Sequence, residues 1–215
     1  MKKKLILMCI AGALVMTAVI GGTLAGFNTS TENKAVTNIT VNELGIDLTS
    51  GSSKEIDKGT IEGIAIVPGG EVEIAQNIIN DVEGGYELYT RVTIGKKWEN
   101  DKLDASKIHV YAGVGEDKSE LVAGTQVNDW IVWYSDEEQI IMYYTKPLNA
   151  GEASKNLIDA VGFDADMDNA YAGAKVVIEF SADAVQTIAA EDSIPSEWGV
   201  YPVIEADKTI SAIEE

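Results

Sequence analysis

The sequence predicts a mainly β protein, an antiparallel jelly-roll-like β-sandwich with one or two short helices. Three observations predict this fold class. Glycine is abundant (20 residues) and proline scarce (4 residues) in a chain rich in β-branched apolar residues. Several short stretches alternate apolar and polar residues with the period of two that is typical of half-buried strands. Clusters of Gly, Pro, Asn, Asp and Ser separate these stretches and indicate turns.

The first thirty residues have the pattern of a secretory signal. Three lysines at 2–4 precede an unbroken apolar run from Leu5 to Ile20, and a small-residue exit ends at Ala25. The run is shorter than the about 20 apolar residues that usually span a bilayer. We therefore expect signal peptidase to cleave between Ala25 and Gly26. The product would be secreted to the cell surface or extracellular matrix, with membrane contact only through the precursor signal. An uncleaved anchor, extended by the two glycines after the run, is the alternative.

The charge of the chain excludes one class of partner. The formal net charge is −19, and removal of residues 1–25, with three lysines and no acids, leaves 13 basic and 35 acidic residues, or −22. Binding to nucleic acid is therefore not expected, because it needs Lys and Arg to neutralise phosphates. The acids are scattered, as on a solvated surface. The one cysteine, Cys9, lies in the signal, so the processed chain has no disulfide. Such an exported chain is typical of a Gram-positive bacterium.

The chain divides into four parts. Residues 1–25 are the expected signal peptide, 26–36 a flexible N-terminal segment and candidate donor strand, 37–204 one β-sandwich domain, and 205–215 an acidic C-terminal tail. A domain of this length is large enough to bury one sizeable core.

The alternation predicts each element in turn. Residues 86–94 give the clearest strand, with Tyr86, Leu88, Thr90, Val92 and Ile94 on its core face. Further strands are predicted at 36–48 (with a bulge near 42–43), 61–67, 71–79, 107–111, 130–134, 139–145 and 175–188. Residues 135–138 join two of these strands as a hairpin. The apolar stripe of Leu157, Ile158 and Val161 predicts one short helix at 153–161, and 191–198 is interpreted as a loose segment.

Several stretches together resemble the TasA/camelysin family of exported proteins. The signal junction from Gly22 to Asn28 is similar to that family's processing site. Pro68-Gly69-Gly70-Glu71 with Tyr89-Thr90-Arg91-Val92 resembles its turn and outward-pointing strand. The run from Tyr143 to Glu152 resembles its strand followed by Leu-x-x-Gly-Glu, and 182–186 with Trp198-Gly199 resembles its closing strand. Each motif is short, but together they extend over most of the processed chain.

The resemblance implies a jelly-roll protein of the cell surface or biofilm matrix that forms fibres. In this family an N-terminal segment freed by signal cleavage pairs with the sheet of the next subunit. Residues 26–41 occupy the matching position, with Phe27, Ile39 and Val41 as donor-strand residues. Strand addition of this kind satisfies an open sheet edge, and a head-to-tail contact propagates. The alternative is that 26–41 form an ordinary first strand of a monomeric protein.

No catalytic constellation is recognisable, so we expect a protein that is not an enzyme. His109 is the only histidine, whereas catalytic zinc usually needs three protein ligands. Neither His-Glu-x-x-His nor Gly-x-Ser-x-Gly occurs. The acids always allow some pair suited to glycoside hydrolysis, but nothing singles one out. Since some relatives in the resembling family are described as metalloproteases, a camelysin-like secreted protease stays as a low-weight alternative.

Two stretches suggest ligand binding. Asp164, Asp166 and Asp168 resemble the opening of a calcium loop, but Asn169 and Lys175 stand where an EF-hand needs Gly and Glu. A weak calcium site and a solvated acidic loop both remain open, and no other cofactor is expected. Trp133 lies in an aromatic-rich region where an exposed ring would stack on a glycan, while a packing role is the alternative. A monomeric module for glycan or calcium is therefore the second functional hypothesis.

Overall fold

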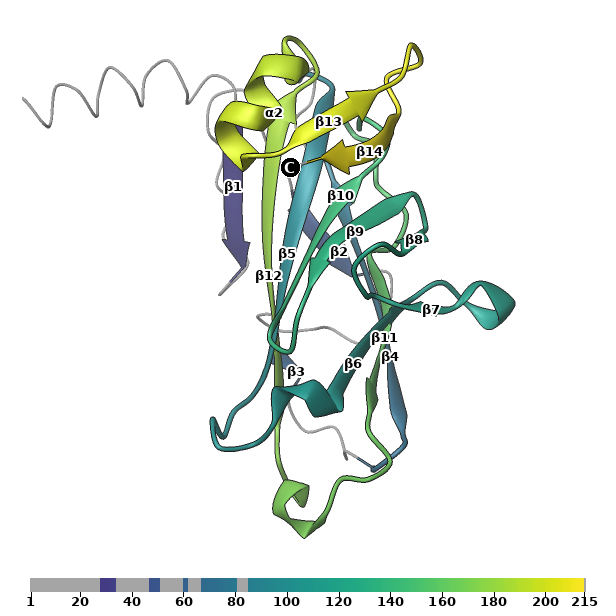
Figure 1. The fold of residues 1–215 in the computed structure, drawn as a ribbon, viewed down its shortest axis with the longest axis vertical. Helices are drawn as coiled ribbons and strands as arrows, with labels where there is room; N and C mark the ends of the chain where they lie inside the picture. The colour runs from purple at the N-terminus through teal and green to yellow at the C-terminus, as the bar shows by residue number, and fades with distance from the viewer. Residues whose placement is uncertain (1–27, 34–46, 51–59, 62–66, 81–84, 215) are drawn as a thin grey trace, which may run out of the picture.

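The computed structural model describes residues 28–33, 47–50, 60–61, 67–80 and 85–214. These residues form two antiparallel sheets packed face to face, with one α-helix and a separate two-stranded hairpin (Figure 1). The predicted fold class, a mainly β antiparallel sandwich, is confirmed. The expected signal and its cleavage site lie outside the described residues, as does most of the strand predicted at 36–48.

The larger sheet has seven strands. Their order is β1 (Asn28–Asn33), β12 (Val176–Gln186), β5 (Leu88–Trp98), β10 (Gln139–Tyr144), β9 (Trp130–Ser135) and β8 (Gln126–Val127), and β3 (Thr60–Ile61) also pairs with β12. The smaller sheet has five strands in the order β2 (Asp47–Ser50), β4 (Glu71–Ile79), β11 (Ile158–Phe163), β6 (Ile108–Ala112) and β7 (Ser119–Glu120).

The chain crosses repeatedly between the two sheets. β4 and β6 belong to the smaller sheet and β5, between them in sequence, to the larger; β11 likewise lies between β10 and β12. Strands of both sheets direct apolar side chains toward the opposite sheet, and these side chains form the core between the two sheets. The core includes Leu88, Val92, Ile108, Trp130 and Val161, each at most 1% exposed.

The predicted core face of the 86–94 strand is confirmed from Leu88 onward. Leu88, Thr90, Val92 and Ile94 are buried, whereas Tyr86 precedes the strand and is exposed. The strand also runs further than predicted, to Trp98. Lys96 lies in the same inward row, and its Nζ donates to the Ile108 carbonyl at 2.8 Å across the core. Burial lowers the pKa of this ammonium group.

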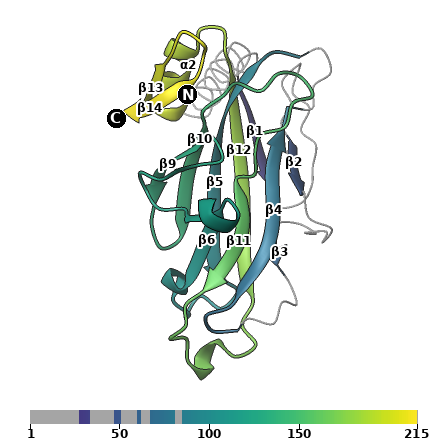
Figure 2. The ribbon, with the colours of Figure 1, turned by 90° about the vertical axis from the view of Figure 1, so that its right-hand side faces the viewer.

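A second apolar cluster lies on the outer face of the larger sheet. Helix α2 (Ala190–Trp198) and the hairpin of β13 (Tyr201–Ile204) and β14 (Ile210–Glu214) cover it at one end of the sandwich (Figure 2). We call these elements the C-terminal cap. They pack on Tyr89, Tyr143 and Val185. The segment expected to be an acidic tail, 205–215, therefore contains a paired strand, β14.

The interpretation of 191–198 as a loose segment is wrong. These residues belong to α2, whose Ala190, Ile194 and Trp198 recur at intervals of four and face the sheet. The helix ends at Gly199, which adopts the left-handed conformation (φ 71°) that suits glycine at a helix C-terminus. Pro195 inside the segment obscured this pattern, because proline is disfavoured within helices.

The short helix predicted at 153–161 is also wrong. β11 begins at Ile158 and lies between β4 and β6 in the middle of the smaller sheet. Side chains of the two neighbouring strands cover its outer face, where Tyr111 of β6 and Glu71 of β4 lie against Gly162. β11 therefore loses the polar–apolar alternation that identifies a strand. Four of its six residues, Ala160 to Phe163, are buried in succession. The hairpin predicted at 135–138 is confirmed as the connection between β9 and β10.

Candidate assembly edge and polar sites

One edge of the larger sheet is completed by the first described strand. β12 pairs with β5 along all eleven of its residues. On its other side, β1 pairs antiparallel with 180–185 and β3 with 176–177. In Figure 1, β1 is the purple strand beside β12 at the margin of the sandwich. We call the outer side of β12 between Phe180 and Val185 the acceptor edge.

The register of β1 on the acceptor edge is continuous. Asn28 lies opposite Val185 and Asn33 opposite Phe180, without a bulge. Within the described part of the chain, β12 is the one strand that pairs with β1, so β1 is an edge strand. Its sequence, Asn-Thr-Ser-Thr-Glu-Asn, is polar throughout, as is common for strands at sheet edges. β1 therefore pairs with β12 through main-chain hydrogen bonds, which do not depend on the identity of its side chains.

The other residues expected to act in assembly lie outside the described residues. These are Ala25 and Gly26 at the cleavage site and Phe27, Ile39 and Val41 of the donor segment. Among the helices that the structure describes, none has both the length and the apolar character needed to cross a bilayer.

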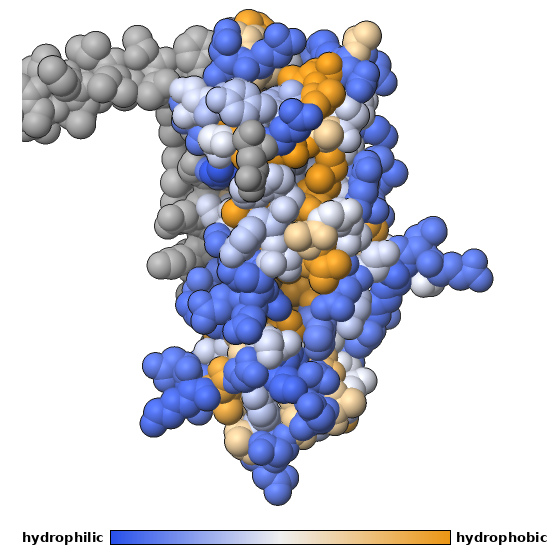
Figure 3. All heavy atoms as spheres, in the orientation of Figure 1, coloured by the Kyte–Doolittle hydropathy of each residue, from blue (hydrophilic) through white to orange (hydrophobic). Residues whose placement is uncertain are grey.

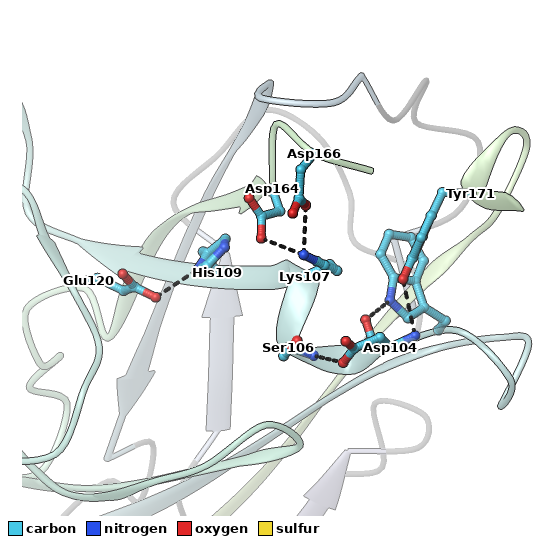
Figure 4. A network of polar contacts seen from close by, with 9 residues as sticks. Asp104, Ser106, Lys107, His109, Glu120, Asp164, Asp166 and Tyr171 are labelled. Atoms are coloured by element: carbon cyan, nitrogen blue, oxygen red, sulfur yellow. Dashed lines mark hydrogen bonds and ion pairs between the residues drawn. The ribbon is translucent and has the colours of Figure 1, made fainter. Parts of the chain in front are cut away.

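The aspartates of the suggested calcium loop surround a lysine. Figure 4 shows Lys107, in the turn just before β6, pointing between two carboxylates from the loop after β11. Its Nζ lies 3.1 Å from Asp164 Oδ2 and 2.6 Å from Asp166 Oδ1. The bonds to Asp166 and Asp164 raise the pKa of Lys107, and Lys107 lowers the pKa of Asp164. A calcium ion at these two carboxylates would have to displace an ammonium group.

Asp168 has a different role from the other two aspartates. Its carboxylate accepts from the Ala170 amide at 2.8 Å and caps the 3₁₀ turn η4 (Asn169–Tyr171). In the ranges that the structure describes, no group of three or more His, Cys, Asp or Glu side chains is placed to hold a metal ion. The weak calcium site at Asp164, Asp166 and Asp168 stays a prediction.

A second polar contact in the same region stabilises the turn before β6. Asp104 accepts from the Ser106 amide at 2.9 Å and caps the 3₁₀ turn η2 (Ala105–Lys107), and this bonding lowers the pKa of Asp104. The Tyr171 hydroxyl accepts from the Asp104 amide at 3.3 Å (Figure 4). These bonds join the turn before β6 to η4, so they stabilise the fold at this end of the sandwich.

His109 lies on the outer face of β6, as expected for a surface histidine. Its Nδ1 is 2.7 Å from Glu120 Oε1 on the neighbouring strand β7, and its side chain is 28% exposed. In a strand pair of this kind, a His–Glu contact acts as a cross-strand link.

The aromatic residues at 130–134 divide between the two faces of β9. Trp130 is fully buried between the sheets and packs on Tyr144, with ring centroids 4.9 Å apart. Trp133 lies on the outer face, half-buried beside the second cluster and edge-on to Tyr143 at 6.3 Å. A register shift between Ile141 and Met142 leaves Trp133 without a direct partner on β10. Tyr134, opposite Ile141, is 40% exposed, and Trp133 is the partly buried indole ring on the outer face of β9.

Comparison with known proteins gave no relative for this chain. No family model matches it, and no curated protein or solved structure is similar to it.

Proposed function

We propose that this protein is an exported, non-catalytic component of a cell surface or extracellular matrix, and that it assembles head-to-tail by exchange of β1 between copies. The observation that carries the proposal is the position of β1. It lies at a sheet edge, pairs with one strand, and is the first described element of the chain. Its removal uncovers the acceptor edge while β12 stays paired with β5.

Exchange needs no new type of contact. The bonds that β1 makes with 180–185 of its own β12 are available to the same residues of another copy. Because each copy both donates a strand and accepts one, the contact is head-to-tail and grows as a filament unless it closes into a ring. Cleavage of the expected signal after Ala25 would free the donor, since an attached leader holds β1 at the membrane.

Charge opposes assembly and makes it dependent on conditions. The processed chain carries a formal charge of −22, so approaching copies repel one another. Salt screens this repulsion over about 8 Å at physiological ionic strength, and mild acid protonates carboxylates. Filaments should therefore form more readily in acid or at high salt.

The proposal is tested with two purified chains, one that begins at Gly26 and one that begins at Lys34 and lacks β1. Electron microscopy at mildly acidic pH should show filaments of the first chain alone. Undiminished filaments of the shorter chain would contradict strand exchange. Turnover of casein or mixed polysaccharides by the longer chain would contradict the non-catalytic part of the proposal.

A pair of proline variants supplies a matched control. In an antiparallel pair, successive residues turn their amide groups alternately toward and away from the partner strand. Ser30→Pro and Thr31→Pro therefore differ, because one removes a bond to β12 and the other faces the open side, where proline is tolerated. We expect one variant to lose filaments and its neighbour to keep them.

A further inference from the structure

The outer face of the larger sheet carries a strip that the C-terminal cap leaves uncovered. The register places Ile141 of β10 opposite Thr93 of β5, and Thr93 opposite Ser181 of β12. On the far side of Ile141 the register places Tyr134 of β9, which is 40% exposed. Trp133, next to Tyr134 at the register shift, is half-buried against the edge of the second cluster. Figure 3 shows this face, where apolar residues run down the molecule below the cap beside paler residues of intermediate hydropathy.

On each side of the strip, the charged residues of β5 and β12 form an ion pair with each other. Above it, Arg91 Nη2 lies 2.5 Å from Asp183 Oδ2. Below it, Lys97 Nζ lies 2.9 Å from Glu179 Oε1. Both ion pairs join β5 to β12, as Thr93 and Ser181 do. Thr93, Ser181, Ile141 and Trp133 are themselves uncharged in a protein whose formal net charge is −19. At the β12 end of the strip, the register places Glu32 of β1 opposite Ser181.

The residues of the strip favour a particular chemistry. Thr93 and Ser181 supply hydroxyl groups that donate and accept hydrogen bonds. Trp133 and Ile141 supply flat apolar surface next to them. The strip crosses four strands, or about 14 Å at the usual spacing between neighbouring strands. A ligand that fits is elongated, uncharged, rich in hydroxyls and apolar on one face.

Acidic residues at one end of the strip exclude anionic ligands. Glu137 and Glu138, in the hairpin between β9 and β10, are exposed just beyond Gln139. Their charge repels phosphates, sulfates and uronic acids, and the charge of the whole chain adds to this effect. A second copy of the chain would bring the same charges to the interface and is disfavoured for that reason.

We propose that this strip binds a neutral oligosaccharide, with Trp133 as the stacking platform and Thr93 and Ser181 as hydrogen-bonding groups. The site lies on the outer face of the sheet, whereas β1 pairs along its edge. A subunit can therefore bind a glycan whether or not it exchanges β1.

The experiment uses the purified protein with cellohexaose and chitohexaose as neutral probes and a hyaluronan hexasaccharide as the anionic probe. Calorimetry and tryptophan fluorescence should detect binding of at least one neutral probe and none of hyaluronan. Trp133→Ala should weaken binding by about tenfold or more, as expected of an aromatic anchor. Tyr201→Ala, which removes an aromatic side chain that is 58% exposed on the cap, should change binding less than about twofold.

A second variant keeps the proposal falsifiable if Trp133→Ala disturbs packing on Tyr143. Thr93→Glu leaves the aromatic contacts in place and puts a charge in the middle of the strip, so it should also weaken binding by about tenfold or more. Absence of binding by both neutral probes at millimolar concentration would overturn the proposal. So would equal affinity in the wild type and both strip variants, or stronger binding of hyaluronan. Sedimentation that shows a dimer dissociated by Thr93→Glu would assign the strip to a second copy instead.

Discussion

The Arg91–Asp183 ion pair should make a much larger contribution to stability than its exposed counterpart on the same two strands. Arg91 Nε and Nη2 both donate to Asp183 Oδ2, at 3.1 and 2.5 Å. The two side chains are 23% and 11% exposed. The guanidinium carbon lies 5.5 Å from the centre of the Trp198 ring in α2, so the pair also contacts the cap.

Arg91→Leu should destabilise the protein by about 3 kcal/mol, since it leaves a largely buried carboxylate without its cation. Loss of the contact with Trp198 is part of this sum and accounts for roughly 0.5–1 kcal/mol. Asp183→Asn, which keeps the shape and removes the charge, should cost about 1.5 kcal/mol. The double variant should cost about 3 kcal/mol and not the about 4.5 kcal/mol of two independent effects, because the shared ion pair is lost only once. The cycle then gives a coupling energy of about 1.5 kcal/mol.

Lys97 and Glu179 provide the matched control. They too join β5 to β12, at 2.9 Å, but their side chains are 55% and 42% exposed. Because solvent screens this pair, its double-variant cycle should give less than about 0.5 kcal/mol and approach zero in 1 M salt. Urea unfolding followed by tryptophan fluorescence measures both cycles. Equal coupling in the two pairs, or additive effects at Arg91 and Asp183, would refute the argument that burial under α2 strengthens the ion pair.

Three further outcomes follow from single contacts. Burial, with Glu87 nearby, raises the pKa of Tyr89 to about 12. The protonated hydroxyl therefore stabilises the folded state fully below the unfolded pKa of about 10, and this contribution is lost as pH rises through 12. Tyr89→Phe, which also removes the bond to the Lys208 carbonyl, should therefore unfold with a flatter pH dependence between pH 10 and 12. Lys107→Met should bind calcium more tightly than the wild type in calorimetric titration, because the competing ammonium group is gone; equal heats would contradict this. Ala189→Gly should stabilise the protein by about 1 kcal/mol in thermal unfolding, since Ala189 has a φ of 59°; a lower melting temperature would count against strain there.

Local patterns in the sequence predicted those strands whose two faces have different surroundings. The 71–79 strand matches β4, and the 130–134 and 139–145 strands with their connection match the β9–β10 hairpin. In these elements one face meets the core and the other is less covered, so the period of two is preserved in the residues. Alternation also placed Trp130 and Trp133 on opposite faces, which the structure confirms. It placed Tyr134 on the face of Trp130, which is wrong, because the register shift pairs Tyr134 with Ile141 and leaves it 40% exposed.

Elements whose character depends on distant parts of the chain could not be predicted in this way. β11 is a strand because β4 and β6 lie on either side of it, although its residues also fit a helical stripe. α2 is stable because the outer face of the larger sheet presents Tyr143 and Val185 to it. The spacing of Ala190, Ile194 and Trp198 before Gly199 was the available signal, and Pro195 concealed it.

The candidate sites show the same limit. The acceptor edge could not be located from sequence, because β1 and β12 are about 150 residues apart and only the strand order joins them. The row from Trp133 to Ser181 depends on the register of four strands from three regions of the chain. The aspartates at 164–168 were recognised, but Lys107, which lies between Asp164 and Asp166, comes from the turn before β6. The sequence identifies the charged and aromatic side chains, whereas the fold determines which of these side chains contact one another.

The proposed exchange of β1 has a consequence for where assembly occurs. A tethered strand competes for its own acceptor edge at an effective concentration in the millimolar range for a short flexible connection. Free subunits at micromolar concentration should therefore stay closed, and the charge of −22 expected of the processed chain reinforces this. Exchange becomes favourable where copies are crowded and their charge is screened or neutralised. Under the proposed export, the surface of the exporting cell would meet these conditions, because the freed donor strand of one copy would emerge beside the acceptor edge of the next.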